Sequence, residues 1–489
     1  MIKAGRAKNQ ADLASSLTVS GFGLWIFLAF VMRESIILLA LQMIDVGSRM
    51  PVKEAGMDNK TLKEIILENK ENFLDRKGII PRDIKVTLND ALKIKHIVVV
   101  TGVRRCGKSC LLSIWADELI KKHSVDPDNI LYINFEDERF IEFKADSLNK
   151  LLETYFELFP GLKGTKYFFF DEIQNIKGWE KFLNRIYETE NYKIFVTGSN
   201  ASLLSEEIST SLTGRSISVE LFPFSFKEYL RYLKHDVTIA ELNKTKTRSI
   251  IKKHFNDYLS NGGFPETLSG EKNINILGEL YKNIIFRDVI VRYSIKNSRQ
   301  FREFSQLASS NIASLHSLSS IKRAMPEIKS VNSIKKYLGF MENCFVFFTV
   351  PKFSPSIKEQ LRNPFKLYMI DNGMFNAVRF SVSDSINKLY ENMVYLYLRR
   401  QHQPSNLFYY NNGFEVDFLI KDKNKIELIQ VCSNVSSSGT IEREERALKK
   451  AMSELGIKRS YIINDDVETE KKIAEGKIIY IPLWKWILE

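Results

Sequence analysis

The segment from Gly102 to Ser109 reads Gly-Val-Arg-Arg-Cys-Gly-Lys-Ser and directly follows an apolar run, Ile-Val-Val-Val, at residues 97–100. It matches the pattern G-x-x-x-x-G-K-[ST], in which a strand turns into a helix around a phosphate group. The glycines let backbone N–H groups turn towards the anion, and the positive end of the helix dipole points to the same place. This pattern predicts a strand, a phosphate-binding loop and a helix, and disfavours a plain surface turn.

The last two residues of this segment carry the side chains that nucleotide binding needs. We expect Lys108 to reach the β- and γ-phosphates and Ser109 to offer its hydroxyl to Mg²⁺, an ion that takes few protein ligands. The predicted nucleotide-binding residues are Gly102, Val103, Arg104, Arg105, Cys106, Gly107, Lys108, Ser109 and Cys110.

Two adjacent carboxylates follow the aromatic run at residues 167–170. We expect Asp171 to hold Mg²⁺ through water, and Glu172 to orient and deprotonate an attacking water molecule. Acids at the end of a strand also cap helices. The phosphate loop upstream favours the catalytic interpretation.

Three further candidates carry a weaker signal. Thr197 and Ser199 follow the apolar run at residues 194–196, and either hydroxyl is a candidate sensor of a γ-phosphate. Arg215 follows a glycine and is a candidate arginine finger, a residue that stabilises transition-state charge and often comes from a neighbouring subunit. An ordinary surface arginine is an equal alternative.

Composition places the chain among globular proteins. Its 489 residues suit about three domains, with 44% hydrophobic and 27% charged residues. The four cysteines form no C-x-x-C pair and none lies beside a histidine at metal-ligand spacing, which favours a reduced, cytoplasmic setting. The net charge of +12 is compatible with a polyanionic partner and equally with a solvated surface.

Residues 19–44 are almost wholly apolar, with Arg33 and Glu34 at their centre. A spanning helix needs about 20 apolar residues without central charges. Three interpretations stay open: translation that starts later, at Met50 or Met57, a membrane-associated helix, and a packed accessory helix. We favour the late start, because the stretch before Met50 has only two lysines whereas the rest is lysine-rich.

Short apolar runs alternate with helical stretches in the first half of the chain, at residues 97–100, 130–135, 167–170, 194–196 and 217–222. This alternation predicts a parallel sheet covered on both faces. From residue 227 the pattern becomes helical, with a break at residues 261–265, which predicts a helical lid.

Residues 300–364 are predicted to form short helices followed by a β pair. Ser330 would cap a helix with four apolar residues on one face, Val331, Ile334, Leu338 and Met341. A strand at 344–350 would then complete a winged helix. Residues 321–366 hold nine Lys or Arg against three Glu. This charge predicts a DNA-binding surface, and a solvated linker module is the alternative.

Seven motifs occur in a fixed order, at residues 102–109, 132–137, 171–176, 179–180, 197–199, 262–266 and 286–289. Together they resemble a widespread family of prokaryotic AAA-type ATPases, whose ATPase core is joined to a C-terminal domain of unknown function. The resemblance starts near residue 57 and reaches the C-terminus. The functional residues it implies are Lys108, Ser109, Asp171 and Glu172 in the nucleotide site, Thr197 or Ser199 as the sensor, and Arg215 as the finger.

The C-terminal part also resembles a restriction-endonuclease-like, PD-(D/E)xK fold. A helix with Glu391 and two strands, at residues 415–418 and 428–432, carry this resemblance. That nuclease pattern needs an acid and then acid-x-Lys to bind metal and activate water. Asp417 fits the first acid, and Glu391 could assist it.

Two positions depart from the nuclease pattern. Gln430 stands at the second acid and Cys432 at the lysine. Gln430 can still ligate Mg²⁺ through its carbonyl, but the attacking water has no activator unless Arg443 or Lys449 substitutes. We therefore favour a scaffold that has lost cleavage.

The predicted fold is α/β, a P-loop NTPase (AAA+-like) parallel sheet core with three further modules. The predicted domains are an N-terminal extension (1–56), the ATPase core (57–226), the helical lid (227–299), a winged-helix-like module (300–364) and a nuclease-like mixed α/β domain (365–489).

The predicted function is binding and hydrolysis of ATP with Mg²⁺, on or with nucleic acid. A nucleotide-controlled protein-binding scaffold and an ATP-gated nuclease are the alternatives. DNA is the expected partner through residues 321–366, and a homo-oligomer stays open. Membrane contact through residues 19–44 is disfavoured.

Overall fold

The computed structural model describes residues 57–144, 146–189, 191–201, 214–268, 274–380, 386–423, 425–435 and 438–489. Residues 59–489 form one compact unit. The predictions for the late start and for residues 19–44 lie outside the described residues. Among the helices of the described ranges, none is both long and apolar enough to cross a membrane.

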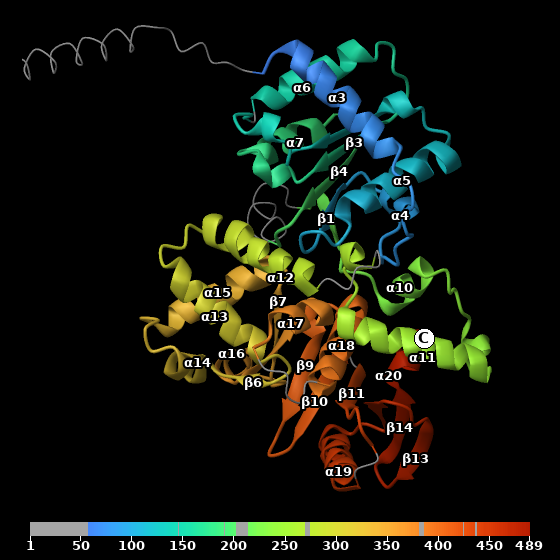
Figure 1. The fold of residues 1–489 in the computed structure, drawn as a ribbon, viewed down its shortest axis with the longest axis vertical. Coiled ribbons are helices and arrows are strands. Elements are labelled where there is room, and N and C mark those ends of the chain that lie inside the picture. The colour runs from blue at the N-terminus through green and yellow to red at the C-terminus, as the bar shows by residue number, and fades with distance from the viewer. Residues whose placement is uncertain are drawn as a thin grey trace, which may run out of the picture. The chain divides into compact units, whose positions relative to one another are not determined.

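The first sheet has five parallel strands in the order β2-β3-β4-β1-β5. Strands β3, β4 and β1 of this sheet are labelled in Figure 1. They are β1 (Ile97–Thr101), β2 (Ile130–Asn134), β3 (Lys166–Asp171), β4 (Tyr192–Gly198) and β5 (Ser216–Glu220). All five strands expected from the apolar runs are present. Strands β1 to β4 are buried along most of their length because helices cover both faces of a parallel sheet.

The helices of this core are α3 (Asn59–Leu74), α4 (Leu88–Leu92), α5 (Lys108–His123), α6 (Ser147–Leu158) and α7 (Trp179–Tyr187). Helix α3 packs on β2, α5 and α6, and α7 packs on β4. Phe73 of α3 stacks on the Tyr132 ring of β2, with ring centroids 3.9 Å apart. Phe73 thereby joins the core that also contains Val103 and Cys106 of the phosphate loop.

Helices follow the parallel sheet, as the pattern from residue 227 predicted. They are α10 (Phe226–Tyr232), η4 (Ile239–Asn243), α11 (Thr245–Asn261), η5 (Pro265–Thr267), α12 (Ile274–Asn283) and the π-helical segment η6 (Ile284–Val291). The predicted break falls where α11 ends. There the N–H of Gly263 donates to Oδ2 of Asp371 at 2.7 Å, which fixes the turn after α11.

A three-stranded antiparallel sheet in the order β6-β8-β7 follows, with helices around it. Its elements are α13 (Ser298–Ser310), β6 (Leu315–His316), α14 (Leu318–Ala324), α15 (Val331–Asn343), β7 (Phe347–Pro351), α16 (Ile357–Arg362) and β8 (Phe365–Met369). Ser330 caps α15 as expected. Strand β7 begins at Phe347 and not at residue 344, because Phe345 turns the chain with φ 58°. The sheet continues through β8, past the boundary expected at residue 364.

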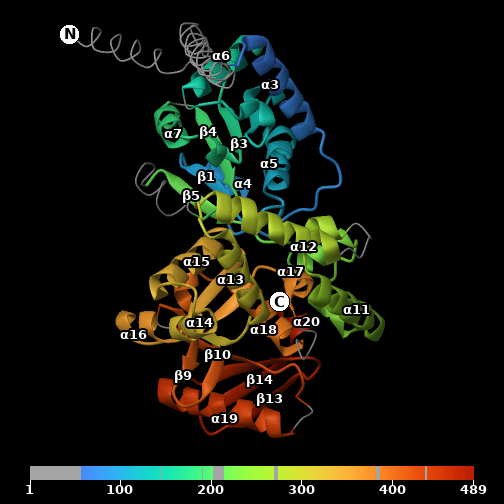
Figure 2. The ribbon, with the colours of Figure 1, turned by 60° about the vertical axis from the view of Figure 1, so that its left-hand side comes forward.

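The C-terminal sheet has six strands in the order β13-β14-β12-β11-β10-β9 and mixes parallel and antiparallel pairs. Its strands are β9 (Leu407–Asn411), β10 (Glu415–Asp422), β11 (Lys425–Val431), β12 (Arg459–Asn464), β13 (Thr469–Ile473) and β14 (Gly476–Pro482). Its helices are α17 (Asn372–Val378), α18 (Ile386–Gln401), α19 (Ser438–Leu455) and α20 (Leu483–Trp486). Helix α19 packs on β10, β11 and β12, so this sheet is a separate mixed α/β layer (Figure 2).

Candidate nucleotide site

The carboxyl ends of three neighbouring strands, β1, β3 and β4, meet at the candidate site. The register places Thr101 of β1 beside Gly198 of β4, and Asn134 of β2 beside Asp171 of β3. Because parallel strands end at the same edge of a sheet, the loops after them carry their side chains to one place. The structure thus brings together the phosphate loop, the adjacent acids and Thr197.

The loop between β1 and α5 needs glycine at two positions. Gly102 has φ 154°, and a Cβ there would lie 2.1 Å from the carbonyl oxygen of Leu221. Gly107 has φ 100° and stands directly before α5. These φ values favour glycine. The loop can therefore pack against the chain at Leu221 while the free N–H groups at the start of α5 lie beside the cavity.

The ammonium group of Lys108 is buried at the base of the loop. Its Nζ lies 3.2 Å from Oε1 of Glu172 and donates to the carbonyl oxygens of Gly102 and Val103 at 3.2 and 3.4 Å. Burial alone would lower the pKa of Lys108, but the charge of Glu172 raises it above its ordinary value. Lys108 is therefore a buried cation with one carboxylate in contact.

Asp171 is buried among hydroxyl groups. Tyr132 donates to its Oδ2 at 2.8 Å, Thr197 donates to its Oδ1, and Ser109 also hydrogen-bonds to its carboxylate. Burial and the charge of Glu172 raise the pKa of Asp171, while these hydrogen bonds oppose the rise. Ser109 and Asp171 therefore stand close enough to share one cation.

The donor set of Ser109 and Asp171 fits Mg²⁺, which prefers hard oxygen ligands and keeps several waters. Nowhere in the described ranges do three or more His, Cys, Asp or Glu residues form a group that could hold a metal ion on its own. A nucleotide-linked Mg²⁺ does not need such a group, because phosphate and water oxygens complete its coordination. These residues could thus hold the ion together with a nucleotide.

Glu172 has a left-handed backbone conformation, with φ 51°, directly after β3. Non-glycine residues in this conformation are uncommon and cluster at functional sites. The backbone N–H of Glu172 donates to Oγ1 of Thr197 at 2.9 Å. Burial favours the neutral acid, but Lys108 and a hydrogen bond from Gln174 keep the pKa of Glu172 below its usual value. The carboxylate is therefore ionised at neutral pH, as a general base must be.

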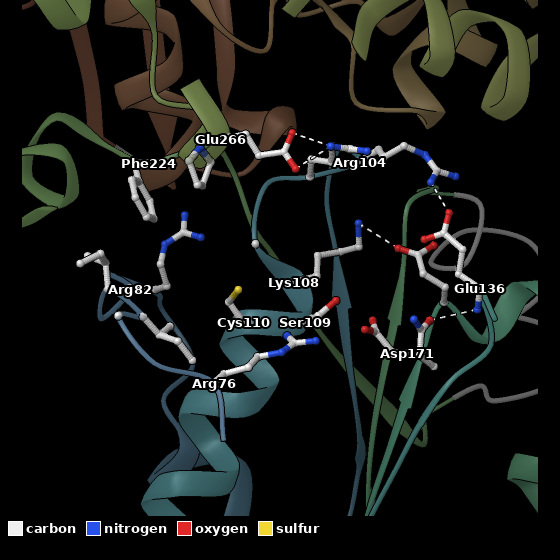
Figure 3. Close-up of a pocket in the computed structure, with 18 of the residues that line it drawn as sticks. Arg76, Arg82, Arg104, Lys108, Ser109, Cys110, Glu136, Asp171, Phe224 and Glu266 are labelled. Atoms are coloured by element: carbon white, nitrogen blue, oxygen red, sulfur yellow. Dashed lines mark hydrogen bonds and ion pairs between the residues drawn. The ribbon is translucent and has the colours of Figure 1, made fainter. Parts of the chain in front are cut away.

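Two arginines of the phosphate loop bind acidic side chains, among them Glu136 and Glu266 (Figure 3). Nε of Arg104 donates to Asp288 of η6 at 3.0 Å, and its Nη1 donates to Glu136. Nη1 of Arg105 lies 2.7 Å from both carboxylate oxygens of Glu266 in η5. The phosphate loop is thus joined to η5 and η6 by charge-assisted hydrogen bonds.

A cavity of about 690 Å³ opens at this site. That volume is in the range of small-molecule pockets. The loop residues that line it are Arg104, Arg105, Gly107, Lys108, Ser109 and Cys110. Gly102, Val103 and Cys106, also predicted to bind nucleotide, are buried and do not line the cavity.

Further residues of the cavity were not among the predicted site residues. Arg76, Arg82 and Arg287 add positive charge, and Ile79, Ile80, Phe224, Tyr232 and Pro265 add apolar surface. Arg82 is fixed by Glu228, whose Oε1 accepts from its Nε at 2.9 Å. Of these residues, only Pro265 and Arg287 lie in sequence motifs, at residues 262–266 and 286–289. The others have no fixed spacing from the phosphate loop, so no motif indicated them.

Hydrogen bonds connect the chain just after β4 with the end of α15. Asn200 donates to the hydroxyl of Tyr293 at 3.0 Å, and Asn343 at the end of α15 donates to the same hydroxyl at 3.1 Å. The N–H of Ala201 donates to the carbonyl of Asn343 at 2.6 Å. Ser199, the other candidate sensor, has a buried hydroxyl with no partner in the part of the chain that is described.

Arg215 does not line the cavity. Its Nη2 lies 2.7 Å from Glu188 and its Nη1 donates to Asn184, on the chain at and after α7. Its side chain is 38% exposed. Within one chain, the structure does not bring this candidate finger to the site.

Three family models match the chain. Residues 94–230 match an AAA domain, residues 252–385 match a domain of unknown function (DUF8612), and residues 387–486 match another domain of unknown function (DUF4143). The AAA match covers the phosphate loop and the adjacent acids. The restriction-endonuclease resemblance is not confirmed by these matches.

Two relatives, both described as uncharacterised proteins, each match more than two thirds of this chain. The protein MJ1544 of Methanocaldococcus jannaschii is 38% identical over 450 residues, which is 88% of this chain and 96% of that protein. A protein of Haemophilus influenzae is 30% identical over 346 residues, covering 69% of this chain and 83% of its own length.

Solved structures give weaker likenesses. PCH-2 of Caenorhabditis elegans superposes with a TM-score of 0.28 at 13% identity, over 43% of this chain and 59% of that one. The ORC1 protein of Aeropyrum pernix, in complex with DNA, gives a TM-score of 0.24 at 11% identity, over 66% of this chain and 96% of that one.

Proposed function

We propose, from the premise that the chain belongs to the family of MJ1544 and carries an AAA domain, that it binds ATP with Mg²⁺ and hydrolyses it. One observation carries the proposal. Lys108, Ser109, Asp171 and Glu172 converge from two elements on one cavity, and the base and the cation among them are buried and charged.

The contacts of each side chain indicate its role in ATP binding and hydrolysis. Lys108 would bind the β- and γ-phosphates, since its ammonium has one carboxylate in contact and the cavity beside it. Mg²⁺, held through Ser109 and Asp171, would neutralise charge on the phosphate oxygens. Glu172 would accept a proton from the attacking water. The apolar surface of Ile79, Ile80 and Tyr232 would contact the adenine base of ATP.

In the structure Lys108 and Glu172 bind each other, and a γ-phosphate would attract the same ammonium. Phosphate binding would therefore compete for Lys108 and release Glu172 to its catalytic role. Thr197 would keep both acids in position, because its hydroxyl donates to Asp171 and accepts from the N–H of Glu172.

Glu172→Gln tests this division. The amide keeps the shape of the side chain but cannot accept the proton, so we expect Mg²⁺-ATP binding to persist while kcat falls about 100-fold or more. Glu303→Gln, an identical change at a half-exposed carboxylate of α13, is the matched control. Equal turnover by wild type and Glu172→Gln would remove Glu172 from the mechanism.

We further propose that the chain acts on duplex nucleic acid through a winged-helix-like module. Helix α15 exposes Asn332, Lys335 and Lys336 and buries Ile334 and Leu338. An exposed basic helix beside a three-stranded sheet suits the phosphate backbone and the major groove. The hydrogen bonds that join Asn343 to the end of β4 would report the nucleotide state to this helix.

Exchange of Lys335 and Lys336 for Glu tests the nucleic-acid proposal. We expect weaker binding of duplex DNA and a shallower dependence of log K on log salt, by about one unit for each phosphate that the variant no longer neutralises. The control is the same exchange at two exposed lysines, Lys423 in the turn after β10 and Lys425 at the start of β11. An equal decrease in affinity in both variants would indicate only a general charge effect.

A further inference from the structure

Lys366 is a buried lysine outside the nucleotide site. It lies on β8, and its side chain is 2% exposed. Its Nζ contacts one oxygen from each of three carboxylates, at 2.9 Å from Glu391, 2.8 Å from Glu415 and 2.7 Å from Asp417. The lysine comes from the three-stranded sheet and the acids come from α18 and β10, so the cluster joins two modules.

This cluster includes the two acids that the nuclease resemblance singled out, Asp417 and Glu391. Arg443 and Lys449 are the candidate substitutes that the sequence offers for the absent lysine. The structure pairs Arg443 with Glu444 and Lys449 with Glu445. The lysine among the acids is Lys366, which no local spacing pattern indicates.

Three carboxylates surround the Lys366 ammonium, which has three donors and no acceptor. Nζ donates hydrogen bonds to Glu391 at 2.9 Å and to Asp417 at 2.7 Å, and its contact with Glu415 at 2.8 Å is an ion pair. The other oxygen of Asp417 accepts the N–H of Val431 at 2.9 Å, and Tyr368 donates to Glu391 at 2.7 Å. The three acids therefore surround Lys366 with more negative charge than its single positive charge can balance.

Charge balance supports the same interpretation. Burial alone would lower the pKa of Lys366, but Asp417, Glu391 and Glu415 raise it well above its ordinary value. Burial and the charge of Asp417 raise the pKa of Glu391 to about 7 even though Lys366 opposes this. The acids therefore need an internal cation, and Lys366 supplies it.

We propose that the ammonium group of Lys366 takes the place that a divalent metal ion would hold among Glu391, Glu415 and Asp417. The C-terminal domain accordingly binds no divalent ion at these acids and does not cleave nucleic acid. Removal of the lysine side chain leaves three carboxylates beside a cavity of about 750 Å³, which Glu391, Glu415 and Asp417 help to line. With Lys366 in place the described acids form no metal-binding group; without the ammonium, such a variant gains a divalent-cation site.

Mn²⁺ binding to the full chain without nucleotide tests the proposal. All proteins in the experiment carry Lys108→Ala, so that the phosphate loop contributes equally to Mn²⁺ binding in each. We expect Lys366→Ala to bind one more Mn²⁺ per chain than the parent, and Asp417→Asn in the same chain to abolish the gain. Lys352→Ala, at a half-buried position directly after β7, is the matched control and should gain nothing.

Mn²⁺ should also raise the melting temperature of Lys366→Ala and not that of the parent. Lys366→Met keeps the aliphatic stem and should bind less Mn²⁺ than Lys366→Ala. A folded Lys366→Ala chain without extra Mn²⁺ would overturn the proposal. So would Mn²⁺ binding or Mn²⁺-dependent DNA cleavage by the parent that Asp417→Asn removes, a result that needs no lysine variant to fold.

Discussion

In the part of the chain that the structure describes, two lysines are buried against carboxylates, and the two sites differ in how much negative charge surrounds the lysine. Lys108 contacts one carboxylate and two carbonyl oxygens beside an open cavity. Lys366 contacts three carboxylates. Each ammonium thus has three oxygen neighbours, and the difference lies in charge: a buried cation attracts an anionic ligand only where few carboxylates already balance its charge. The same residue type therefore suits ligand binding in one region and structure in the other.

The largest expected effect separates the two lysines by activity. Lys108→Met removes the cation that would bind the β- and γ-phosphates, and we expect ATP hydrolysis to fall by about 1,000-fold or more, since positioning and charge stabilisation dominate phosphoryl transfer. Phosphate release under saturating ATP is the measurement. Lys366→Met should keep most of the turnover wherever the chain stays folded. Similar decreases in both variants would break the comparison.

The next effect concerns stability, where Lys366 is expected to matter more than Lys108. Lys366→Met leaves Asp417, Glu391 and the partly exposed Glu415 without their cation, which should lower the free energy of unfolding by about 3–5 kcal/mol. Urea unfolding at pH 8 measures it. Lowering the pH should restore part of this stability, because protonation removes the uncompensated charge. A smaller decrease than that of Lys352→Ala would show that Lys366 is not essential to the cluster.

Glu391 gives a smaller effect that depends on pH. Its pKa of about 7 in the folded chain lies above its ordinary value, so the native state binds more protons than the unfolded state between about pH 4.5 and pH 7. Stability therefore falls as pH rises through this window. Glu391→Gln should flatten the slope. Asp371, with a pKa that burial raises to about 6, acts in the same direction and should leave a residual slope.

The smallest expected effect concerns coupling between the nucleotide site and α15. Tyr293→Phe removes the hydroxyl that accepts from both Asn200 and Asn343. We expect the effect of ATP on DNA affinity to shrink by about 0.5–2 kcal/mol. Titration of labelled duplex with and without ATP measures it. The control is Tyr337→Phe, whose hydroxyl donates to Gln300 at 3.4 Å; an equal change there would argue against the proposed route.

The parts of the site that lie within one strand and its following loop were predictable from the sequence. The phosphate loop, Asp171 and Glu172 have fixed spacing because a parallel strand delivers them to the sheet edge. All five core strands and the cap of α15 by Ser330 were also confirmed. In these segments local chemistry decides both the structure and the role of the residue.

The remaining residues depend on tertiary packing. Lys366 stands 25 residues from Glu391 and 51 from Asp417, on a strand of another sheet, so no local pattern connects them. The same holds for Asp288, which reaches Arg104 from 184 residues away. Strand β7 begins three residues later than expected, because the apolar run also contains the turn at Phe345. Hydropathy alone does not distinguish a buried turn from a strand.

The most direct measurement is a calorimetric titration of the full chain with ATP and Mg²⁺, for wild type, Lys108→Met and Lys366→Met. The comparison predicts one ATP bound per chain in wild type and in Lys366→Met, and none in Lys108→Met. ATP binding that survives in Lys108→Met, or is absent from folded wild type, would contradict the claim that Lys108 is the lysine left free for a ligand.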